Sequence, residues 1–303
     1  MNYLKELICG KTVEIQDRAF AKINLFLNVE HKRNDGYHDI KSYMQSVSLC
    51  DNLKMRVKMS QIPRITVSVS GNPNIPSDER NLAYRAADAY MKWCKVKLAV
   101  EIDIEKNIPM EAGLAGGSSD AASVLRMINA VLSNLLPADE LAMIGAGIGS
   151  DVPFCLFGGT KLCEGRGEIL THVKLGAPLY LVIAKSEESV STPRMYRKLD
   201  EMYGNFDGVM NIEAEMKYSM LSHAIVRGDI FDIATNLYNI FEKPVMDICP
   251  KTEKIKEMIL ANGAMGAMLS GSGPSVFGIF ESKEKAMTVA EKIGSVAVYA
   301  ESI

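Results

Sequence analysis

The feature that most constrains this chain is a glycine-rich stretch between a strand pattern and a helix pattern. Apolar and polar residues alternate over 96–105, which predicts a half-buried strand. From residue 121 onward, apolar residues recur at helical spacing. The stretch between them, 106–123, reads KNIPMEAGLAGGSSDAAS. A glycine loop that leads into a helix favours phosphate, because free N–H groups and the helix dipole both attract an anion.

A competing interpretation is a tight turn that only caps the helix. Ser118, Ser119 and Asp120 are all residue types that cap a helix N-terminus. Against that interpretation, three glycines within five residues let the backbone approach a ligand closely, and Lys106 adds a positive charge. The stretch fits neither G-x-x-x-x-G-K-[ST] nor G-x-G-x-x-G. We therefore predict a phosphate-binding loop of another type.

Composition limits the possible functions. The chain has 303 residues, of which 48% are hydrophobic and 23% charged, as in a soluble globular protein of one large or two ordinary domains. The net charge of −3 and the lack of a basic run argue against a nucleic-acid partner. No run has the length of a membrane span, and the first 16 residues lack a signal-peptide core. Six cysteines and four histidines are scattered, so we expect reduced thiols, no protein-bound metal and a cytoplasmic location.

Further periodic segments predict the remaining elements. Residues 1–16 predict a short extra strand or an irregular arm, and 19–29 a strand with Lys22 and Asn24 on one face. Runs at 53–57 and 65–69 predict antiparallel strands, and helices are expected from about 82 and over 137–144. A loop is expected over 145–154, and helices from about 192 to 242. The last part predicts a β-α-β-β-α-β order with extra helices, from strand 179–184 through helix 251–261, strands 264–269 and 275–280, helix 283–293 and strand 296–299.

Three separated motifs together resemble the GHMP kinases, the family of galacto-, homoserine, mevalonate and phosphomevalonate kinases. The first is Ala-Lys-x-Asn-Leu at 21–25, in which Phe20 replaces a usual proline. The second is Pro-x-x-x-Gly-Leu-x-x-Gly-Ser-Ser at 109–119, and the third is Ser-Gly-Ser-Gly-Pro-Ser at 270–275. The resemblance implies an α+β fold with a ribosomal-protein-S5-like α/β domain, 1–177, and a ferredoxin-like domain, 178–303. It also implies an ATP-dependent kinase whose Mg²⁺ is carried by the nucleotide.

The resemblance assigns roles to individual residues. Gly-Ser-Asp-Val-Pro-Phe at 149–154 is similar to the segment that carries the family's proposed base, so Asp151 and Lys22 are the expected catalytic pair. The alternative for Asp151 is a turn or cap residue. Asn81 is either a nucleotide contact or a helix-start residue. The expected nucleotide-binding residues are Asn81, Lys106, Pro109, Gly113, Leu114, Ala115, Gly116, Gly117, Ser118 and Ser119.

The turn Asp-Gly-Tyr-His at 35–38 resembles the branch of the family whose substrate carries cytidine. Tyr37 and Tyr196 offer flat faces for a pyrimidine, and His38 offers hydrogen bonds to its polar edge. For each, an ordinary surface or packing role is the alternative. The expected substrate-binding residues are Asn24, Tyr37, His38, Tyr196, Gly271, Ser272 and Gly273.

Two other functions stay open from sequence. One is a GHMP kinase for another alcohol, such as homoserine or mevalonate, although neither has a pyrimidine to stack. The other is a catalytically inactive ligand sensor with the same fold, against which Lys22, Asp151 and all three loops argue. The expected partner is a small-molecule substrate, without nucleic acid or membrane, and the expected assembly is a monomer or weak homodimer.

Overall fold

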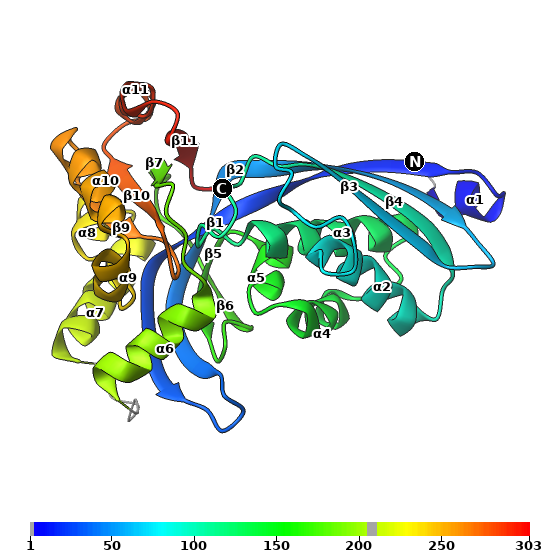
Figure 1. Cartoon of the computed structure of the whole chain (residues 1–303), viewed down its shortest axis with the longest axis horizontal. Helices are drawn as coiled ribbons and strands as arrows, with labels where there is room; N and C mark the ends of the chain where they lie inside the picture. Colours follow the sequence, from blue (N-terminus) through cyan, green and yellow to red (C-terminus); the bar gives the residue numbers. More distant parts are fainter. Residues whose placement is uncertain (1–2, 205–210) are drawn as a thin grey trace. The chain divides into compact units, whose positions relative to one another are not determined.

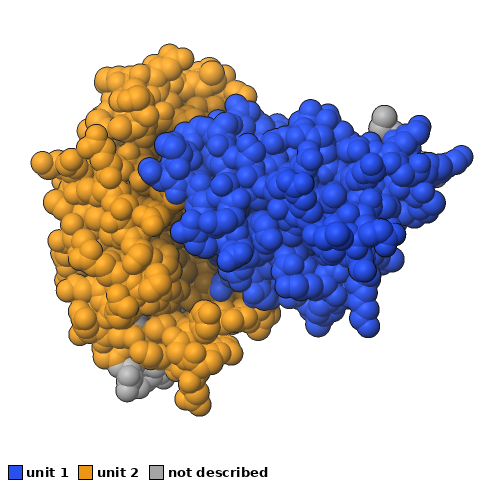
Figure 2. Space-filling model, turned by 45° about the vertical axis from the view of Figure 1, so that its right-hand side comes forward, with its two compact units in different colours: residues 1–21, 50–108, 115–157 blue, residues 22–49, 109–114, 158–303 orange. Residues whose placement is uncertain are grey.

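A computed structural model describes residues 3–204 and 211–303 of the chain (Figure 1). The chain forms two compact units that interleave along the sequence (Figure 2). Unit 1 comprises residues 1–21, 50–108 and 115–157, and unit 2 comprises 22–49, 109–114 and 158–303. The long strands β1 (Val13–Lys32) and β2 (His38–Met59) each contribute one end to unit 1 and the other to unit 2. The two units therefore differ from a division of the chain at 177/178. That predicted domain boundary stays a prediction.

Unit 1 contains four neighbouring strands in the order β3-β4-β2-β1. They are β1 (Val13–Lys32), β2 (His38–Met59), β3 (Arg64–Ser70) and β4 (Leu98–Glu105). The two runs predicted as antiparallel strands do form β2 and β3, but β4 lies between them. It pairs antiparallel with β2, where Met55 faces Ile102, and parallel with β3, where Val67 faces Ile102.

Helices cover one face of this sheet (Figure 1). They are α2 (Leu82–Cys94), α3 (Gly116–Val131), α4 (Ala138–Ile148) and α5 (Val152–Phe157). The apolar positions at helical spacing explain the packing, because Ala83, Ala86 and Tyr90 of α2 are buried with Leu125 and Ile128 of α3. This core fixes α3, and with it the glycine loop that precedes it.

Two expectations for unit 1 were wrong. Residues 3–8 form a helix, α1 (Tyr3–Ile8), and residues 13–16 begin the long strand β1, rather than an extra strand or an arm. The loop expected over 145–154 is mostly helical, because α4 continues to Ile148 and α5 begins at Val152. Gly145 lies inside α4 where a Cβ atom would come within 2.9 Å of Val152 Cγ1. Glycine there permits close helix packing, and the sequence pattern alone does not separate that use from a loop.

Unit 2 contains an antiparallel sheet in the order β11-β7-β10-β9. Its strands are β7 (Tyr180–Lys185), β9 (Gly266–Leu269), β10 (Ser275–Phe280) and β11 (Ala297–Glu301). In chain order this is fourth, first, third, second, the ferredoxin-like arrangement of a β-α-β-β-α-β unit. The predicted α+β fold class with a ferredoxin-like part is confirmed.

Other elements complete unit 2. Helices α10 (Pro250–Ala261) and α11 (Lys283–Ile293) contact the ferredoxin-like sheet, and both follow the predicted ranges within one residue. The remaining elements are β5 (Thr160–Glu164), β6 (Ile169–Val173), α6 (Thr192–Tyr203), α7 (Ile212–Arg227), α8 (Ile230–Thr235), β8 (Tyr238–Asn239) and α9 (Glu242–Ile248). Over the described ranges, no helix has both the length and the apolar character to cross a membrane. All six cysteines are free thiols.

Candidate active site

Lys22 lies in unit 2 beside the glycine loops of the second and third motifs. Its backbone N–H donates to the Leu114 carbonyl at 3.1 Å. Its ammonium donates to Asn24 Oδ1 at 2.8 Å and lies 3.3 Å from the position that a Cβ atom on Gly271 would take. Lys22 is buried. A lysine on a strand is ordinarily on the solvated side, so this burial distinguishes Lys22 from a surface residue.

The loops 109–114 and 270–274 contact each other directly within unit 2. Ser270 Oγ donates to the Gly113 carbonyl at 3.0 Å, and the Ser275 N–H donates to the Ala112 carbonyl at 3.3 Å. Gly113 has a φ of +73°, and a Cβ there would lie 2.0 Å from the Ser270 carbonyl oxygen. Only glycine satisfies both constraints. The third motif is therefore more than a hairpin turn, because it holds the loop of the second motif.

Asn239 supports this loop pair from β8. Its side-chain amide donates to the carbonyl groups of Leu269 and Gly271 at 2.9 and 2.8 Å. At the other side, Ser272 Oγ lies 2.8 Å from Thr192 Oγ1, at the start of α6. Gly271, Ser272 and Gly273, expected to bind substrate, thus lie in a loop tied to both β8 and α6.

The first turn of α3 lies in unit 1 and differs from the sequence expectation. The helix begins at Gly116, with Ala115 as its N-cap in the left-handed conformation (φ +58°) and without a side-chain cap. Ser118, Ser119 and Asp120 fall inside the helix and were wrongly expected to cap it. The Ser119 hydroxyl instead donates to the Phe20 carbonyl. The first N–H groups of α3, from Gly116 to Ser118, have no intrahelical acceptor and are available to an anion.

Lys106 lies beneath this turn rather than projecting from it. Its ammonium forms buried ion pairs with Asp51 and, at 2.7 Å, with Asp120. Asp51 also accepts from the backbone N–H groups of Asn107 and Ile108 at 2.6 and 2.8 Å. A Cβ on Gly116 would lie 3.3 Å from the Lys106 ammonium. This geometry favours support of the loop from below over the direct phosphate contact expected from sequence.

Two carboxylates share the single ammonium of Lys106, and the pKa values of Asp120 and Lys106 are shifted as a result. Burial raises the pKa of Asp120 most, and the Asp51 carboxylate raises it further against the attraction of Lys106, to about 8. Burial lowers the pKa of Lys106, but the two carboxylates outweigh it and hold that pKa above its usual value. Oδ1 of Asp120 is buried and has no hydrogen-bond partner among the described residues. A proton on Asp120 would make the cluster neutral.

Asp151 lies between α4 and α5, also in unit 1. Its carbonyl accepts from the Cys155 N–H at 3.0 Å, so its backbone opens α5 as the cap interpretation expects. The segment is close to the glycine loop, because a Cβ on Gly149 would lie 3.6 Å from Ser118 Oγ. Lys22 belongs to unit 2 and Asp151 to unit 1. Their joint action in catalysis stays a prediction.

His38 and Tyr196 are brought together in unit 2. Their rings stack with centroids 4.9 Å apart, and Phe241 packs edge-on against the other side of Tyr196 at 4.9 Å. His38 Nε2 lies 2.7 Å from Asp200 Oδ1, and Lys32 Nζ lies 2.5 Å from Asp200 Oδ2. Burial raises the pKa of Asp200, but the hydrogen bonds from Lys32 and His38 outweigh it and leave that pKa below its usual value. Asp200 is thus an anionic partner shared by Lys32 and His38.

Tyr37 differs from its neighbour His38 in exposure. Tyr37 is 53% exposed, whereas His38 is 7% exposed. The Arg166 guanidinium lies 5.0 Å from the Tyr37 ring centroid, and Asp35 accepts from the Tyr37 N–H. An exposed ring beside a buried histidine is available to a flat ligand.

Asn81 is a helix-start residue, which was one of its two expected roles. It is the N-cap of α2, where its side-chain oxygen accepts from the Ala83 N–H at 2.9 Å and its amide donates to the Pro76 carbonyl at 2.8 Å. Its nucleotide role stays a prediction.

Several supporting residues carry no signal in the sequence. Asp51, Asp200, Asn239 and Ser42 are isolated polar residues, and their partners lie far along the chain.

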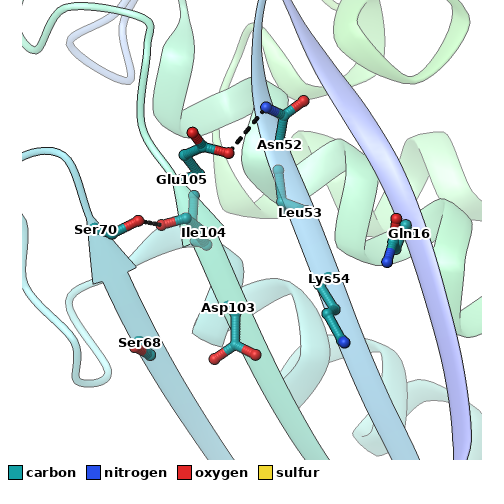
Figure 3. Close-up of a pocket in the computed structure, with 9 residues that line it drawn as sticks. All are labelled: Gln16, Asn52, Leu53, Lys54, Ser68, Ser70, Asp103, Ile104 and Glu105. Atoms are coloured by element: carbon teal, nitrogen blue, oxygen red, sulfur yellow. Dashed lines mark hydrogen bonds between the residues drawn. The ribbon is translucent and has the colours of Figure 1, made fainter.

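A hollow lies elsewhere, on the open face of the sheet in unit 1 (Figure 3). It has a volume of about 270 Å³, and Asn52, Lys54, Asp103 and Glu105 are among its lining residues. None of the expected site residues lines it. Across the described residues, no group of three or more His, Cys, Asp or Glu side chains is arranged to hold a metal.

Comparison with known proteins decides the family. Residues 81–159 match the model of the GHMP kinases N-terminal domain, and residues 221–298 match that of the GHMP kinases C-terminal domain. The chain belongs to the GHMP kinase family. The second motif, 109–119, and the third, 270–275, fall within these two matches.

Individual relatives show which members of the family this chain resembles. The chain is 44% identical over 276 residues to a 4-diphosphocytidyl-2-C-methyl-D-erythritol kinase of Caldicellulosiruptor bescii, covering 91% of this chain and 93% of that one. It is 40% identical to the protein of that name from Clostridium botulinum (strain Eklund 17B / Type B), covering 91% and 94%.

Solved structures of GHMP kinases also resemble this chain. A crystal structure of 4-(cytidine 5'-diphospho)-2C-methyl-D-erythritol kinase matches with a TM-score of 0.75 and 30% identity, covering 95% of this chain and 99% of that one. An L. major mevalonate kinase in complex with R-mevalonate matches with a TM-score of 0.77, covering 96% of each chain. At 17% identity, that match shows the fold alone.

Proposed function

We propose that this GHMP kinase transfers a phosphoryl group from ATP to the 2-hydroxyl of 4-diphosphocytidyl-2-C-methyl-D-erythritol, in the non-mevalonate route to isoprenoid precursors. The relatives that carry that name span almost the whole chain at 40–44% identity. Membership of the family supports phosphoryl transfer from ATP as the reaction, and the residues around His38 support the choice of substrate.

One chain of contacts carries the substrate assignment. Lys22 lies next to Gly271, Ser272 bonds to Thr192, and Thr192 opens α6. Tyr196 follows one helical turn later and stacks on His38. Through these contacts the catalytic lysine and the aromatic cluster belong to one continuous arrangement in unit 2. Homoserine and mevalonate have no ring that such a cluster would recognise.

The proposed mechanism relies on positioning and charge, because phosphoryl transfer asks little covalent chemistry of the protein. The N–H groups at the start of α3 would bind ATP phosphates, with Mg²⁺ arriving on the nucleotide. Asp151 would accept the proton of the 2-hydroxyl, and Lys22 would orient that hydroxyl and stabilise its developing negative charge. Gly113, which allows the two loops to touch, would keep the backbone close to the phosphates.

An ADP-release assay tests the proposal. The purified protein is given ATP with the cytidine substrate, its uridine analogue, homoserine, mevalonate or galactose. We expect rapid ADP release with the cytidine substrate alone, because a site built to pair a polar edge rejects an analogue that lacks it. Preference for homoserine or mevalonate would leave only the family assignment. ATP binding without turnover of any alcohol would favour the ligand sensor.

A further inference from the structure

A buried relay of hydrogen bonds leads away from Lys22 inside unit 2. Lys22 Nζ donates to Asn24 Oδ1 at 2.8 Å, and Asn24 Nδ2 donates to Ser42 Oγ at 2.8 Å. The Ser42 hydroxyl donates to the Phe26 carbonyl at 2.6 Å. The exposed fractions of Lys22, Asn24 and Ser42 are 4%, 1% and 0%. The relay therefore joins β1 to β2 without access to solvent.

The direction of each bond in this relay is determined by chemistry. The Phe26 carbonyl only accepts, so the Ser42 hydroxyl must donate its one proton there. The Ser42 oxygen is then left to accept, which requires the NH₂ group of Asn24 to point toward it. The carbonyl oxygen of Asn24 must in turn point to Lys22, whose ammonium only donates. The fixed backbone acceptor thus decides the orientation of the Asn24 amide.

We infer that Ser42 is a positioning residue for Lys22, acting through the side-chain amide of Asn24. The inference rests on the catalytic role proposed for Lys22. Both ends of the Asn24 amide are engaged and its side chain is almost fully buried, which favours support of Lys22 over the direct substrate contact expected from sequence.

Loss of the Ser42 hydroxyl would remove the restraint on the amide. With alanine at position 42, the NH₂ group of Asn24 has no acceptor, while Lys22 still needs one. An amide that turns over would present a donor to an ammonium, and the two would repel. Lys22 would move, and a shift of about 1 Å in a reacting arrangement costs roughly 10²-fold in rate.

The test compares Ser42→Ala, Ser42→Thr and the wild type with the alcohol that the wild type phosphorylates best. We expect Ser42→Ala to lower kcat by roughly tenfold to 10²-fold, with the KM values of ATP and the alcohol little changed. Ser42→Thr keeps a hydroxyl on a strand that suits β-branched residues, so kcat should recover most of the loss. Thermal unfolding of each variant separates a rate effect from loss of fold.

Ser186→Ala is the matched control. Ser186 is also buried in unit 2, where its hydroxyl lies 3.4 Å from Thr252 Oγ1, away from the relay. Its loss should leave kcat within about twofold of the wild type, even if Tm falls as much as in Ser42→Ala. If the role of Ser42 is purely structural, Ser42→Ala and Ser186→Ala should have similar kcat values.

The outcomes distinguish the inference from the proposed function. A folded Ser42→Ala variant with wild-type kcat overturns the inference. If Ser42→Ala does not fold, Ser42→Cys replaces it, because cysteine has a similar size but is a weak hydrogen-bond donor. A wild-type kcat in Ser42→Cys would likewise overturn the inference. Failure of the proposed function is visible earlier, in the wild type, as lack of turnover of the cytidine substrate.

Discussion

Lys106 and Asp120 form an ion pair buried beneath the start of α3, with Nζ and Oδ2 2.7 Å apart. Asp51 binds the same ammonium, so the cluster contains two carboxylates and one lysine. Such a cluster joins the end of β4 to the first turn of α3 and also responds to pH.

The first prediction concerns stability against pH. The pKa of Asp120 is raised to about 8 in the folded protein, whereas an unfolded aspartate has a pKa near 3.9. Between about pH 4 and 8 the folded state holds a proton that the unfolded state has released. The free energy of unfolding should therefore fall as pH rises through this window, by at most about 1.4 kcal/mol per pH unit from this group.

Asp120→Asn cannot ionise, so it should flatten that fall in urea titrations run from pH 5 to 9. Asp139→Asn, at an exposed position in α4, is the control and should keep the wild-type slope. If Asp120→Asn also keeps the wild-type slope, Asp120 does not carry the proton.

The second prediction concerns the chemical step. Asp151→Asn keeps the size of the side chain and most of its hydrogen bonding, but it removes basicity. Loss of a general base costs roughly 10²–10⁴ in rate, so kcat should fall by that factor while the KM of the alcohol changes little. Asp139→Asn again serves as the control. A kcat near that of the wild type would rule out Asp151 as the base.

The third prediction concerns the glycine loop. A Cβ on Gly116 would lie 3.0 Å from Ile108 Cγ2 and 3.3 Å from Lys106 Nζ, and valine adds two methyl groups. Gly116→Val should weaken ATP binding in calorimetry by roughly tenfold or more, while the protein remains folded. Gly147→Val, in α4 with no atom within 4 Å of its Cβ, controls for valine in a helix. Equal ATP affinity in both variants would make the loop structural only.

The fourth prediction concerns substrate choice. Stacking on an aromatic side chain is worth about 1–3 kcal/mol per base. Tyr37→Ala should therefore raise the KM of the cytidine substrate by roughly 5-fold to 150-fold and leave the KM of ATP nearly unchanged. Phe231→Ala removes a similarly exposed ring from α8 and should change neither value. If Tyr37→Ala weakens ATP instead, Tyr37 belongs to the nucleotide side of the site.

Much of the fold was predictable because periodicity reports local structure. Helix α11 has the expected bounds, 283–293, and the β9–β10 pair encloses the expected third motif. The start of α3 was misplaced, because Ala115 adopts the left-handed conformation and the helix begins directly at Gly116. Serine and aspartate are good caps in general, but here a backbone turn takes that place.

The supporting contacts of the candidate site were not predictable, because they depend on which strands and helices meet. Lys106 was noticed as a charge beside a glycine loop, yet its partner Asp51 is 55 positions earlier. Asp200 lies 162 positions from His38. No local pattern pairs such residues, so the sequence motifs point to candidate site residues but not to the residues that hold them.

The contact between Gly113 and Ser270 also affects how the protein is made. The two residues are 157 positions apart, so the loop of the second motif obtains its partner only after residue 270 has been synthesised. Contacts of such long range form slowly, because a large loop must close before they contribute. During synthesis, a chain that ends before residue 270 carries the loop of the second motif without the hydroxyl that holds it. Kinase activity should therefore appear abruptly, once the chain extends past the third motif, rather than grow with chain length.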